Sequence, residues 1–293
     1  MCAKTGLERK IHQDIQTEIL NYYDRMGISY KTDESAPEST IVDFFSYLYK
    51  MIPDRKRKVE YSNELKIKMD NGELPREQVD ILKKYEDAFK EGKNMNDFLS
   101  NKTGGPDKID FLLYTWHLYH LHLSGKFDAK MKNNRSDTLL LCIVNNECVY
   151  FVDVIPHPKK AKDYFKLRYL EIIKNNNWME YIDFFEIPNM EPGSLEPKIT
   201  SEEDIFLLYS KGAVNISFEF EGKGYSSLLL MTSTRNPEYA VKQLQKINRE
   251  IRCLNNPEED YKGFRFAISK GGYLMGIVKF ENSKHEVLQY NIF

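Results

Sequence analysis

The sequence predicts an α+β protein with a helical N-terminal region, a central antiparallel sheet with helices, and a C-terminal α+β module with its own antiparallel sheet. Three observations support this prediction. Apolar residues recur at spacings of three and four through residues 6–26, which gives a helix one apolar face. Two runs rich in β-branched and aromatic residues, 138–144 and 147–155, flank an Asn-Asn turn and predict a hairpin. Three short segments between residues 264 and 292 predict a final meander.

Residues 1–105 are predicted to form the helical region. Helices are expected over residues 6–26, 41–52, 75–91 and 95–100. Pro53 should end the second of these helices, because proline cannot continue a helix interior. The basic run that follows, residues 54–58, is interpreted as a solvated loop or helix start.

Residues 106–187 are predicted to form a central α+β domain around the hairpin. A Gly-Gly-Pro sequence at 104–106 interrupts the helical pattern, and Asp107 is expected to cap a helix from residue 108 to about 117 or 119. A second helix is expected over 162–174, after the hairpin. The aromatic segment 178–187 is a candidate strand.

Residues 188–200 are predicted to be a linker between domains. Three prolines fall within residues 188–197, and proline does not join helix interiors or central strands. Residues 201–293 would then form the C-terminal module. Its expected elements are a helix over 201–210, strands over 214–220 and 225–232, a helix beginning at Asn236-Pro237, and the meander.

Composition limits the class of protein. Hydrophobic residues make up 41% and charged residues 29% of the chain, with a net charge of −2, which is typical of an ordinary globular protein. No apolar run approaches the roughly 18 residues that cross a bilayer, and the first residues lack the apolar core of a signal peptide. We therefore expect a cytoplasmic protein without membrane contact. The four cysteines lack metal-binding spacing, so they are interpreted as structural thiols, with no metal or other cofactor.

Histidines mark the candidate functional site. Three of the six, His117, His120 and His122, fall in one short apolar stretch, and His157 follows the predicted hairpin. Imidazole exchanges protons near neutral pH and is the commonest metal ligand. Residues 123–175 carry 10 Lys or Arg against 6 Asp or Glu, so positive charge gathers around these histidines.

Three hypotheses explain the histidines. They could be core residues with satisfied polar groups, although packing explains one histidine better than three. They could hold a metal, because His120 and His122 on a strand, together with His157, would supply three nitrogens for catalytic zinc, with Asp153 or Asp128 adding a carboxylate. They could instead cleave a phosphodiester without metal. His120 and His122 point the same way only if that stretch is extended.

Metal-free cleavage of RNA needs a base for the ribose 2′-hydroxyl, an acid for the leaving 5′-oxygen, and a cation to stabilise the pentacoordinate phosphorane. Histidine and arginine meet these three needs. The predicted proton-transfer groups are His120, His122 and His157, the phosphate clamp is Arg135, and the substrate-binding residues are Lys159 and Lys160.

The stretch from Asp107 to Asn175, a helix followed by Arg135-Ser-Asp-Thr-Leu-Leu-Leu-Cys-Ile-Val and a second strand that leads to His157, resembles the RelE-type toxin ribonucleases. In that family, helices precede an antiparallel sheet whose face carries basic residues and a proton-transfer group. The resemblance implies a metal-independent endoribonuclease of toxin or phage-defence type. Its expected partners are RNA, a protein partner such as an antitoxin, and a second copy of the chain.

Two other classes of function stay open at this point. One is a non-catalytic inhibitor or adaptor that binds a protein partner through aromatic sheet surfaces. The other is a histidine-ligated, metal-dependent phosphodiesterase or nuclease. Whether the imidazoles of His120, His122 and His157 meet in one place distinguishes a site from scattered core residues.

Overall fold

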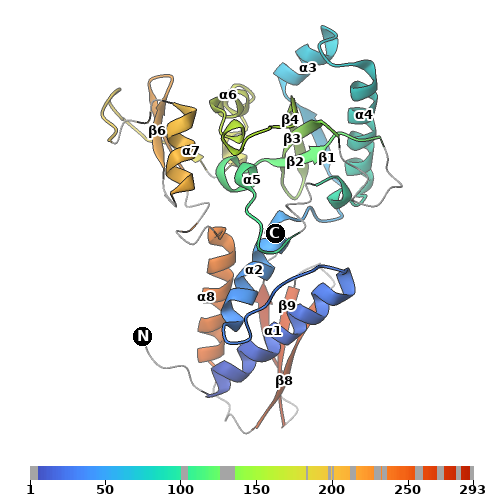
Figure 1. Ribbon diagram of the computed structural model, residues 1–293, viewed down its shortest axis with the longest axis vertical. Coiled ribbons are helices and arrows are strands. Elements are labelled where there is room, and N and C mark those ends of the chain that lie inside the picture. The colour runs from blue at the N-terminus through green and yellow to red at the C-terminus, as the bar shows by residue number, and fades with distance from the viewer. Residues whose placement is uncertain are drawn as a thin grey trace. The chain divides into compact units, whose positions relative to one another are not determined.

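The computed structural model is an α+β fold, as predicted. It describes residues 6–99, 105–125, 136–182, 184–196, 199, 201–211, 216–227, 232, 236–254, 260–268, 274–281 and 285–290. The chain forms two compact units, shown in Figure 1. The first unit comprises residues 1–49, 105–108 and 236–293, and the second comprises residues 50–104 and 109–235.

The first unit combines the N-terminal and C-terminal parts of the chain. Its helices are α1 (Gly6–Met26), α2 (Pro37–Lys50) and α8 (Glu238–Arg252), and its sheet has the order β10-β9-β8, formed by β8 (Tyr261–Ile268), β9 (Leu274–Phe280) and β10 (His285–Tyr290). All pairs in this sheet are antiparallel, which confirms the predicted meander. The helix predicted over 6–26 is confirmed, and α2 begins before the predicted residue 41.

The predicted C-terminal module over 201–293 is therefore wrong, because its last elements pack with the N-terminal helices. Ile11, Ile15 and Ile19 form the buried face of α1, and α8 buries Ile247 and Ile251. The apolar face of a helix has to pack against another element, so each of these helices needs a partner from elsewhere in the chain. Polar contacts bind the same elements: His12 Nε2 lies 2.7 Å from Asn248 Oδ1, and Tyr261 donates to Asp14 over 2.6 Å.

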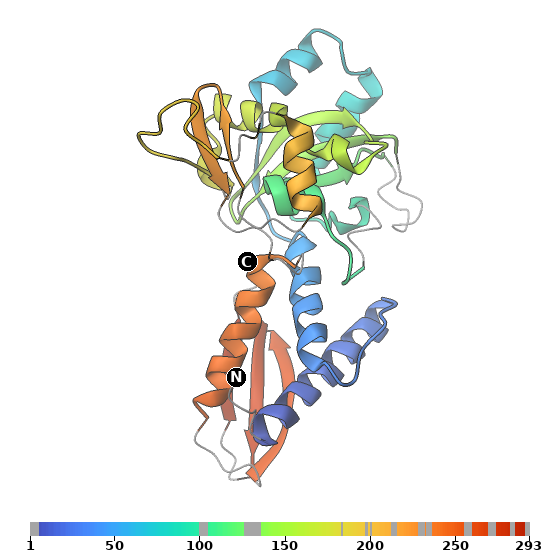
Figure 2. The same cartoon turned by 60° about the vertical axis from the view of Figure 1, so that its left-hand side comes forward.

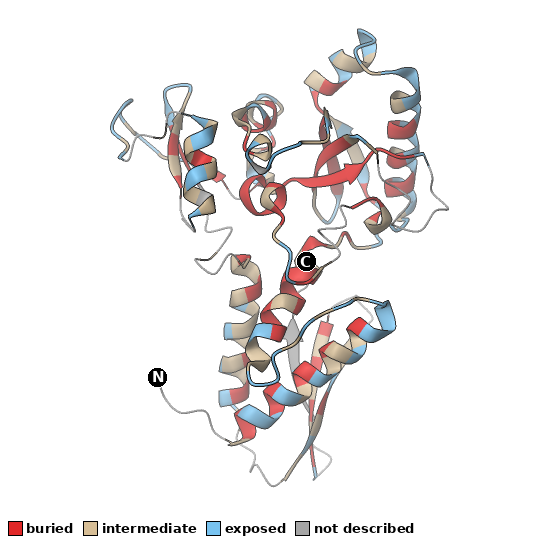
Figure 3. Ribbon diagram, viewed as in Figure 1, coloured by how far each residue is buried: buried red, intermediate tan, exposed pale blue. Residues whose placement is uncertain are grey.

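The second unit is built around a four-stranded sheet with the order β1-β4-β3-β2. Its strands are β1 (Lys58–Tyr61), β2 (Tyr119–His122), β3 (Thr138–Val144) and β4 (Cys148–Pro156). The antiparallel pairing of β3 with β4 confirms the predicted hairpin, and β1 adds to β4 in parallel. Both hairpin strands are almost entirely buried, as the red ribbon in Figure 3 shows, which explains why they read as near-continuous apolar runs.

Helices surround this sheet. They are α3 (Asn63–Asp70), α4 (Arg76–Glu91), α5 (Phe111–Trp116), α6 (Leu167–Asn175) and α7 (Glu202–Ser210), with the 3₁₀ turns η1 (Asn96–Phe98), η3 (Ala161–Tyr164) and η4 (Met179–Tyr181). The cap of α5 is Asp110, which accepts from the Leu113 N–H, and Asp107 is not the cap. Asp110 replaces it because its carboxylate lies where the first free N–H groups of the helix begin.

The basic run 54–58 is not a simple solvated loop. The Arg57 side chain is buried, and its guanidinium donates to the carbonyls of Asn145 and Pro53 over 2.7 Å in each case. Lys58 then begins β1. A buried guanidinium needs such acceptors, because an unpaired buried charge is costly. Arg57 therefore holds the hairpin turn against the chain that leads into β1.

The predicted linker 188–200 does not separate two domains. The strand before it, β5 (Phe184–Glu186), pairs with β7 (Lys223–Ser227) in a sheet of order β5-β7-β6 that also contains β6 (Ser217–Phe220). The Gly193 N–H donates to Glu219 over 2.6 Å, which ties the segment to this sheet. The prolines explain why the segment forms no strand. The strands on either side of it nevertheless pair with each other, so the segment lies within one unit.

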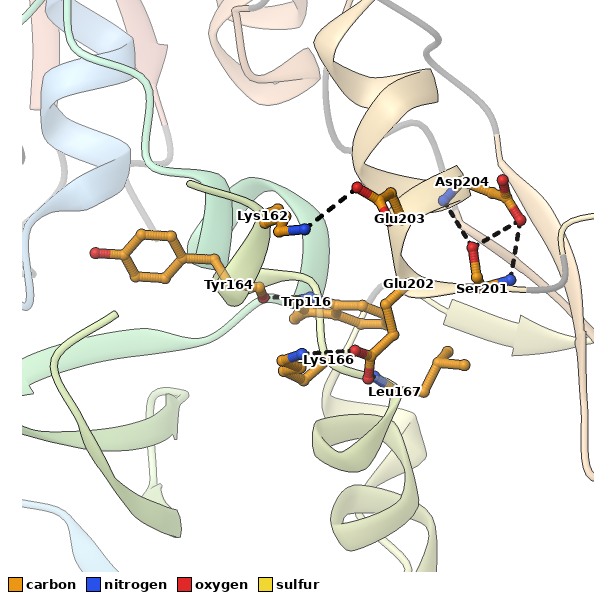
Figure 4. Close-up of polar contacts among 9 residues, drawn as sticks. All are labelled: Trp116, Lys162, Tyr164, Lys166, Leu167, Ser201, Glu202, Glu203 and Asp204. Carbon is orange, nitrogen blue, oxygen red and sulfur yellow. Dashed lines mark hydrogen bonds and ion pairs between the residues drawn. The ribbon is translucent and has the colours of Figure 1, made fainter. Parts of the chain in front are cut away.

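The first turn of helix α7 contacts η3 and the start of α6 (Figure 4). The Glu202 carboxylate accepts from Lys166 Nζ over 2.7 Å and from the Leu167 N–H over 3.0 Å, at the first turn of α6. Glu203 pairs with Lys162 in η3 at 3.2 Å. Figure 2 shows α7 lying beside η3, as these contacts require. A glutamate at a helix N-terminus satisfies free N–H groups there, so Glu202 acts on α6 as well as on its own helix.

Proteolytic nicking of the exposed segment 188–196 is expected to leave the two fragments associated. Most of its residues are exposed, so a protease should cut there before it cuts the flanking elements. The fragments should nevertheless co-elute in size-exclusion chromatography, because β5 and β7 remain paired across the cut. Separation of the fragments under native conditions would show that this pairing does not hold the second unit together.

Candidate functional site

Strand β2 presents two histidines on one face of the four-stranded sheet. Residues 119–122 are extended, so His120 and His122 point to the same side. His122 lies opposite Leu139 of β3, and Leu139 lies opposite Ile155 of β4. A side chain two residues beyond Ile155 continues on this face, and that residue is His157. The sheet register thus brings residues 122 and 157 together from opposite sides of β3.

His122 and His157 form a stacked pair. Their ring centroids are 5.3 Å apart and their planes differ by 23°. The His157 N–H donates to the Asp137 carbonyl over 2.7 Å, which keeps the chain beyond β4 alongside the start of β3. The prediction that at least two of the three histidines lie close together is confirmed.

Backbone carbonyls hold both rings of the pair. His122 Nδ1 lies 2.9 Å from the Ser136 carbonyl oxygen, and His157 Nδ1 lies 3.1 Å from the Pro158 carbonyl oxygen. A carbonyl oxygen only accepts hydrogen bonds, so His157 Nδ1 donates to Pro158 and the lone pair of that neutral ring is on Nε2. His122 Nδ1 faces both the Ser136 carbonyl and, at 3.3 Å, the Ser136 N–H, so the backbone of Ser136 holds this ring in either tautomer. Orientation of one ring nitrogen by a backbone carbonyl is a usual way to prepare the other for proton transfer.

His120 lies in a different environment, beside a carboxylate. Its Nδ1 is 3.6 Å from Asp110 Oδ2, and both side chains are buried. This nitrogen makes no hydrogen bond with any residue that the structure describes, whereas Asp110 Oδ1 accepts from the Leu113 N–H. The Tyr164 ring lies 6.2 Å from the imidazole. His120 is therefore enclosed between Asp110, which caps α5, and Tyr164 of η3, whereas His122 packs its ring on that of His157.

Several buried phenols and thiols around the four-stranded sheet stay protonated. Burial and then the negative charge of Asp110 raise the pKa of Tyr164, and burial raises the pKa of Tyr169. Burial also raises the pKa of Cys142 and Cys148, and both thiols are free. Neutral phenols and thiols are hydrogen-bond donors and poor nucleophiles. The interpretation of Cys142 and Cys148 as structural thiols fits their burial.

The candidate metal ligand Asp153 is engaged elsewhere. Its carboxylate accepts from Lys68 Nζ over 2.7 Å and from the Val154 N–H over 2.8 Å. Within the described residues, no group of three or more His, Cys, Asp or Glu side chains is arranged to hold a metal ion. Asp128 lies outside the described residues.

Of the basic residues predicted to bind substrate, Lys159 and Lys160 are exposed and follow Pro158, the residue after His157. Arg135, the predicted phosphate clamp, lies outside the described residues. In the described part of the chain, two lysines thus carry the local excess of positive charge close in sequence to His157.

An open pocket of about 740 Å³ lies between α4 and the residues that follow β2, and sequence reasoning did not find it. One side is formed by α4 and the other by residues 123–125 and Ser136, the residue whose carbonyl holds His122. The charged residues of α4 that line the pocket are Arg76, Glu77, Asp80 and Lys84. The repeat of charged residues at 76, 80 and 84 marks one face of a helix and was the available signal.

Comparison with protein-family models, curated proteins and solved structures gives no match for this chain. Among the described residues, no helix has both the length and the apolar character needed to span a bilayer. Function is therefore inferred from the chemistry of the residues that the fold brings together.

Proposed function

We propose that this chain is a metal-independent endoribonuclease that cleaves RNA by acid-base chemistry at His122 and His157. The observation that carries the proposal is the stacked imidazole pair, with each Nδ1 held by a backbone carbonyl. Two imidazoles in one place can supply a base and an acid in the same step. Core packing would not require two rings from separate strands to be oriented in the same manner.

In the proposed reaction, His122 Nε2 removes the proton from a ribose 2′-hydroxyl. The 2′-oxygen then attacks phosphorus, and the bond from phosphorus to the 5′-oxygen breaks. Protonated His157 gives its proton to that leaving oxygen. The products are a 2′,3′-cyclic phosphate and a 5′-hydroxyl. The acid role goes to His157 because it is the more exposed of the two and must recover its proton from water.

Cations complete the proposed site. Charge builds up on the phosphorane oxygens in the transition state, and fixed positive groups stabilise it. Lys159 and Lys160 are exposed two and three residues after His157. Arg135 remains the proposed phosphate clamp, and Arg135→Lys should restore only part of its contribution, since an ammonium lacks the guanidinium fork. His120 takes a positioning role in this proposal, because it is buried against Asp110.

The resemblance to RelE-type toxin ribonucleases supports the same chemistry. In the stretch that carries the resemblance, α5 precedes β2, β3 and β4, and two histidines and two exposed lysines lie near the ends of β2 and β4. A toxin or defence role in the cytoplasm, with an antitoxin or a second copy of the chain as partner, belongs to this proposal.

Purified protein is expected to cleave single-stranded RNA in the presence of EDTA. The same sequence with 2′-O-methyl groups should remain intact, because it lacks the attacking hydroxyl. End-group analysis by mass spectrometry should find 2′,3′-cyclic phosphates. Loss of cleavage in EDTA with recovery on added Zn²⁺ would favour a metal-dependent nuclease instead. A protein that cleaves no RNA under either condition, yet binds a protein partner stoichiometrically, would favour an interaction module.

A further inference from the structure

We propose that Tyr85 of α4 is a positioning residue for His122, the base of the proposed reaction. Its hydroxyl group bonds to the backbone of the residues on either side of Leu123, at the point where β2 ends. The inference rests on the proposed ribonuclease function, because the exact place of His122 matters for cleavage only if this residue takes part in it.

Strand β2 lies at one edge of the four-stranded sheet, and one side of its backbone pairs with β3. The Leu123 N–H donates to the Thr138 carbonyl over 2.9 Å, so the backbone groups of Leu123 point toward β3. In an antiparallel pair, the groups of the neighbouring residues point the opposite way. The carbonyl of His122 and the N–H of Ser124 therefore point away from β3. Both residues are buried, so these groups need a partner outside the sheet.

Tyr85 supplies that partner. Its hydroxyl donates to the His122 carbonyl and accepts from the Ser124 N–H over 3.1 Å. The Ser124 carbonyl lies farther from the hydroxyl, at 3.2 Å. Burial raises the pKa of Tyr85, so the phenol keeps its proton at neutral pH and remains a donor. One side-chain group thus takes the place of a neighbouring strand at the end of β2, and it contacts the backbone of His122 directly.

The ring of Tyr85 is fixed in turn by the segment around η1. The side chain is fully buried, and its ring centroid lies 4.8 Å from that of Phe98. The next residue, Leu99, forms a β-bridge with Leu121 of β2. The same short segment therefore packs against Tyr85 and pairs with β2, which leaves the hydroxyl little freedom to move.

His122 is held both at its backbone and at its ring. Tyr85 bonds to its carbonyl, and the backbone of Ser136 faces its Nδ1. Removal of the hydroxyl would take this partner from the His122 carbonyl and the Ser124 N–H, and the backbone would shift to satisfy them. The imidazole would move with it, away from its place on the ring of His157. A displacement of about 1 Å can reduce a rate about a hundredfold, even when the mutated residue does not touch the substrate.

The test compares Tyr85→Phe with Tyr61→Phe. Tyr61 of β1 donates to Glu86, the residue that follows Tyr85 in α4, over 2.8 Å. Both changes delete one hydroxyl in a hydrogen bond that involves α4, but only Tyr85→Phe removes a bond to β2. The measurements are kcat and KM with a fluorogenic oligoribonucleotide, and the imidazole signals of His122 in heteronuclear NMR. Thermal unfolding followed by circular dichroism checks that both variants fold.

We expect Tyr85→Phe to lower kcat at least about tenfold and to leave KM within about twofold of the wild type, because Tyr85 acts through His122 and not on the substrate. The imidazole signals of His122 should shift. Tyr61→Phe should lower the unfolding temperature without either effect. An equal loss of kcat in both variants would mean that general loosening of α4 is responsible, and would overturn the inference.

The positioning role and the ribonuclease function can fail separately. A wild-type protein that cleaves no RNA would remove the ribonuclease function, whereas a shift of the His122 signals in Tyr85→Phe alone would still establish the positioning contact. Normal cleavage of RNA by Tyr85→Phe, with unchanged signals of His122, would keep the ribonuclease function and remove the positioning role.

Discussion

The change His157→Ala is expected to reduce cleavage of RNA by about two to four decades, the usual contribution of a general acid or base. His157 donates the proton to the leaving oxygen in the proposed reaction, and alanine cannot replace it. The side chain is only half-buried and follows the end of β4, so the fold should change little. The measurement is kcat/KM with a fluorogenic oligoribonucleotide, accompanied by thermal unfolding followed by circular dichroism.

His117, which lies in the same stretch of sequence as His122, supplies the matched control. His117 ends α5 with a positive φ of 55°, a conformation that asparagine adopts readily, so His117→Asn removes an imidazole without backbone strain. It should keep most activity, whereas His122→Ala should lose about as much as His157→Ala. The wild-type pH profile should be bell-shaped, and each of the two damaging variants should lack one limb. Full activity of His157→Ala would rule out the proposed acid.

The change Trp116→Ala is expected to lower the free energy of unfolding by about 3–5 kcal/mol, the usual cost of replacing a buried tryptophan. Trp116 is fully buried at the end of α5. Its ring stacks on Phe184 of β5 at a centroid distance of 5.5 Å and lies edge-on to Phe218 of β6 at 6.3 Å. It therefore connects the small sheet to the helix that precedes β2. Urea denaturation followed by circular dichroism measures the loss.

A conservative variant separates stacking from hydrogen bonding at this position. Trp116 Nε1 donates to the Tyr164 carbonyl over 3.1 Å, and phenylalanine cannot make that bond. Trp116→Phe keeps the aromatic contact, so it should cost less than Trp116→Ala, with about 1–3 kcal/mol from the carbonyl left without its donor. Equal losses for both variants would mean that the hydrogen bond to Tyr164, and not the ring contact with the small sheet, supplies the stabilisation at this position.

Local patterns predicted several elements correctly because their signals are contained in a few neighbouring residues. The spacing of Ile11, Ile15 and Ile19 predicted α1, and the composition of the two runs around Asn145 predicted the hairpin. The predicted cap of α5, Asp107, lies three residues before the observed cap, Asp110, because the sequence offers an aspartate at both positions. Short elements such as β1 and α3 were missed, because their stability comes from tertiary packing more than from their own sequence.

The candidate site was predictable in part. An HxH pattern places two imidazoles on one face of a strand, and a hairpin returns the chain toward its start, so a meeting of His122 with His157 followed from the sequence if the register allowed it. The sequence did not distinguish His120 from His122. Their difference arises from Asp110, which lies beside only one of them once α5 has formed.

The sequence by itself determined the α+β class, the long helices, the hairpin and the concentration of histidines, because each depends on side-chain periodicity or composition over a short stretch. Only the tertiary structure decided that residues 236–293 pack with α1, and that β5 pairs with β7 across the proline-rich segment. Only it placed Tyr85 of α4 against the backbone carbonyl of His122. These pairings depend on which apolar faces and strand edges, far apart in sequence, pack against one another. Several partners are possible for each such surface, so the pattern of a short segment cannot identify the right one.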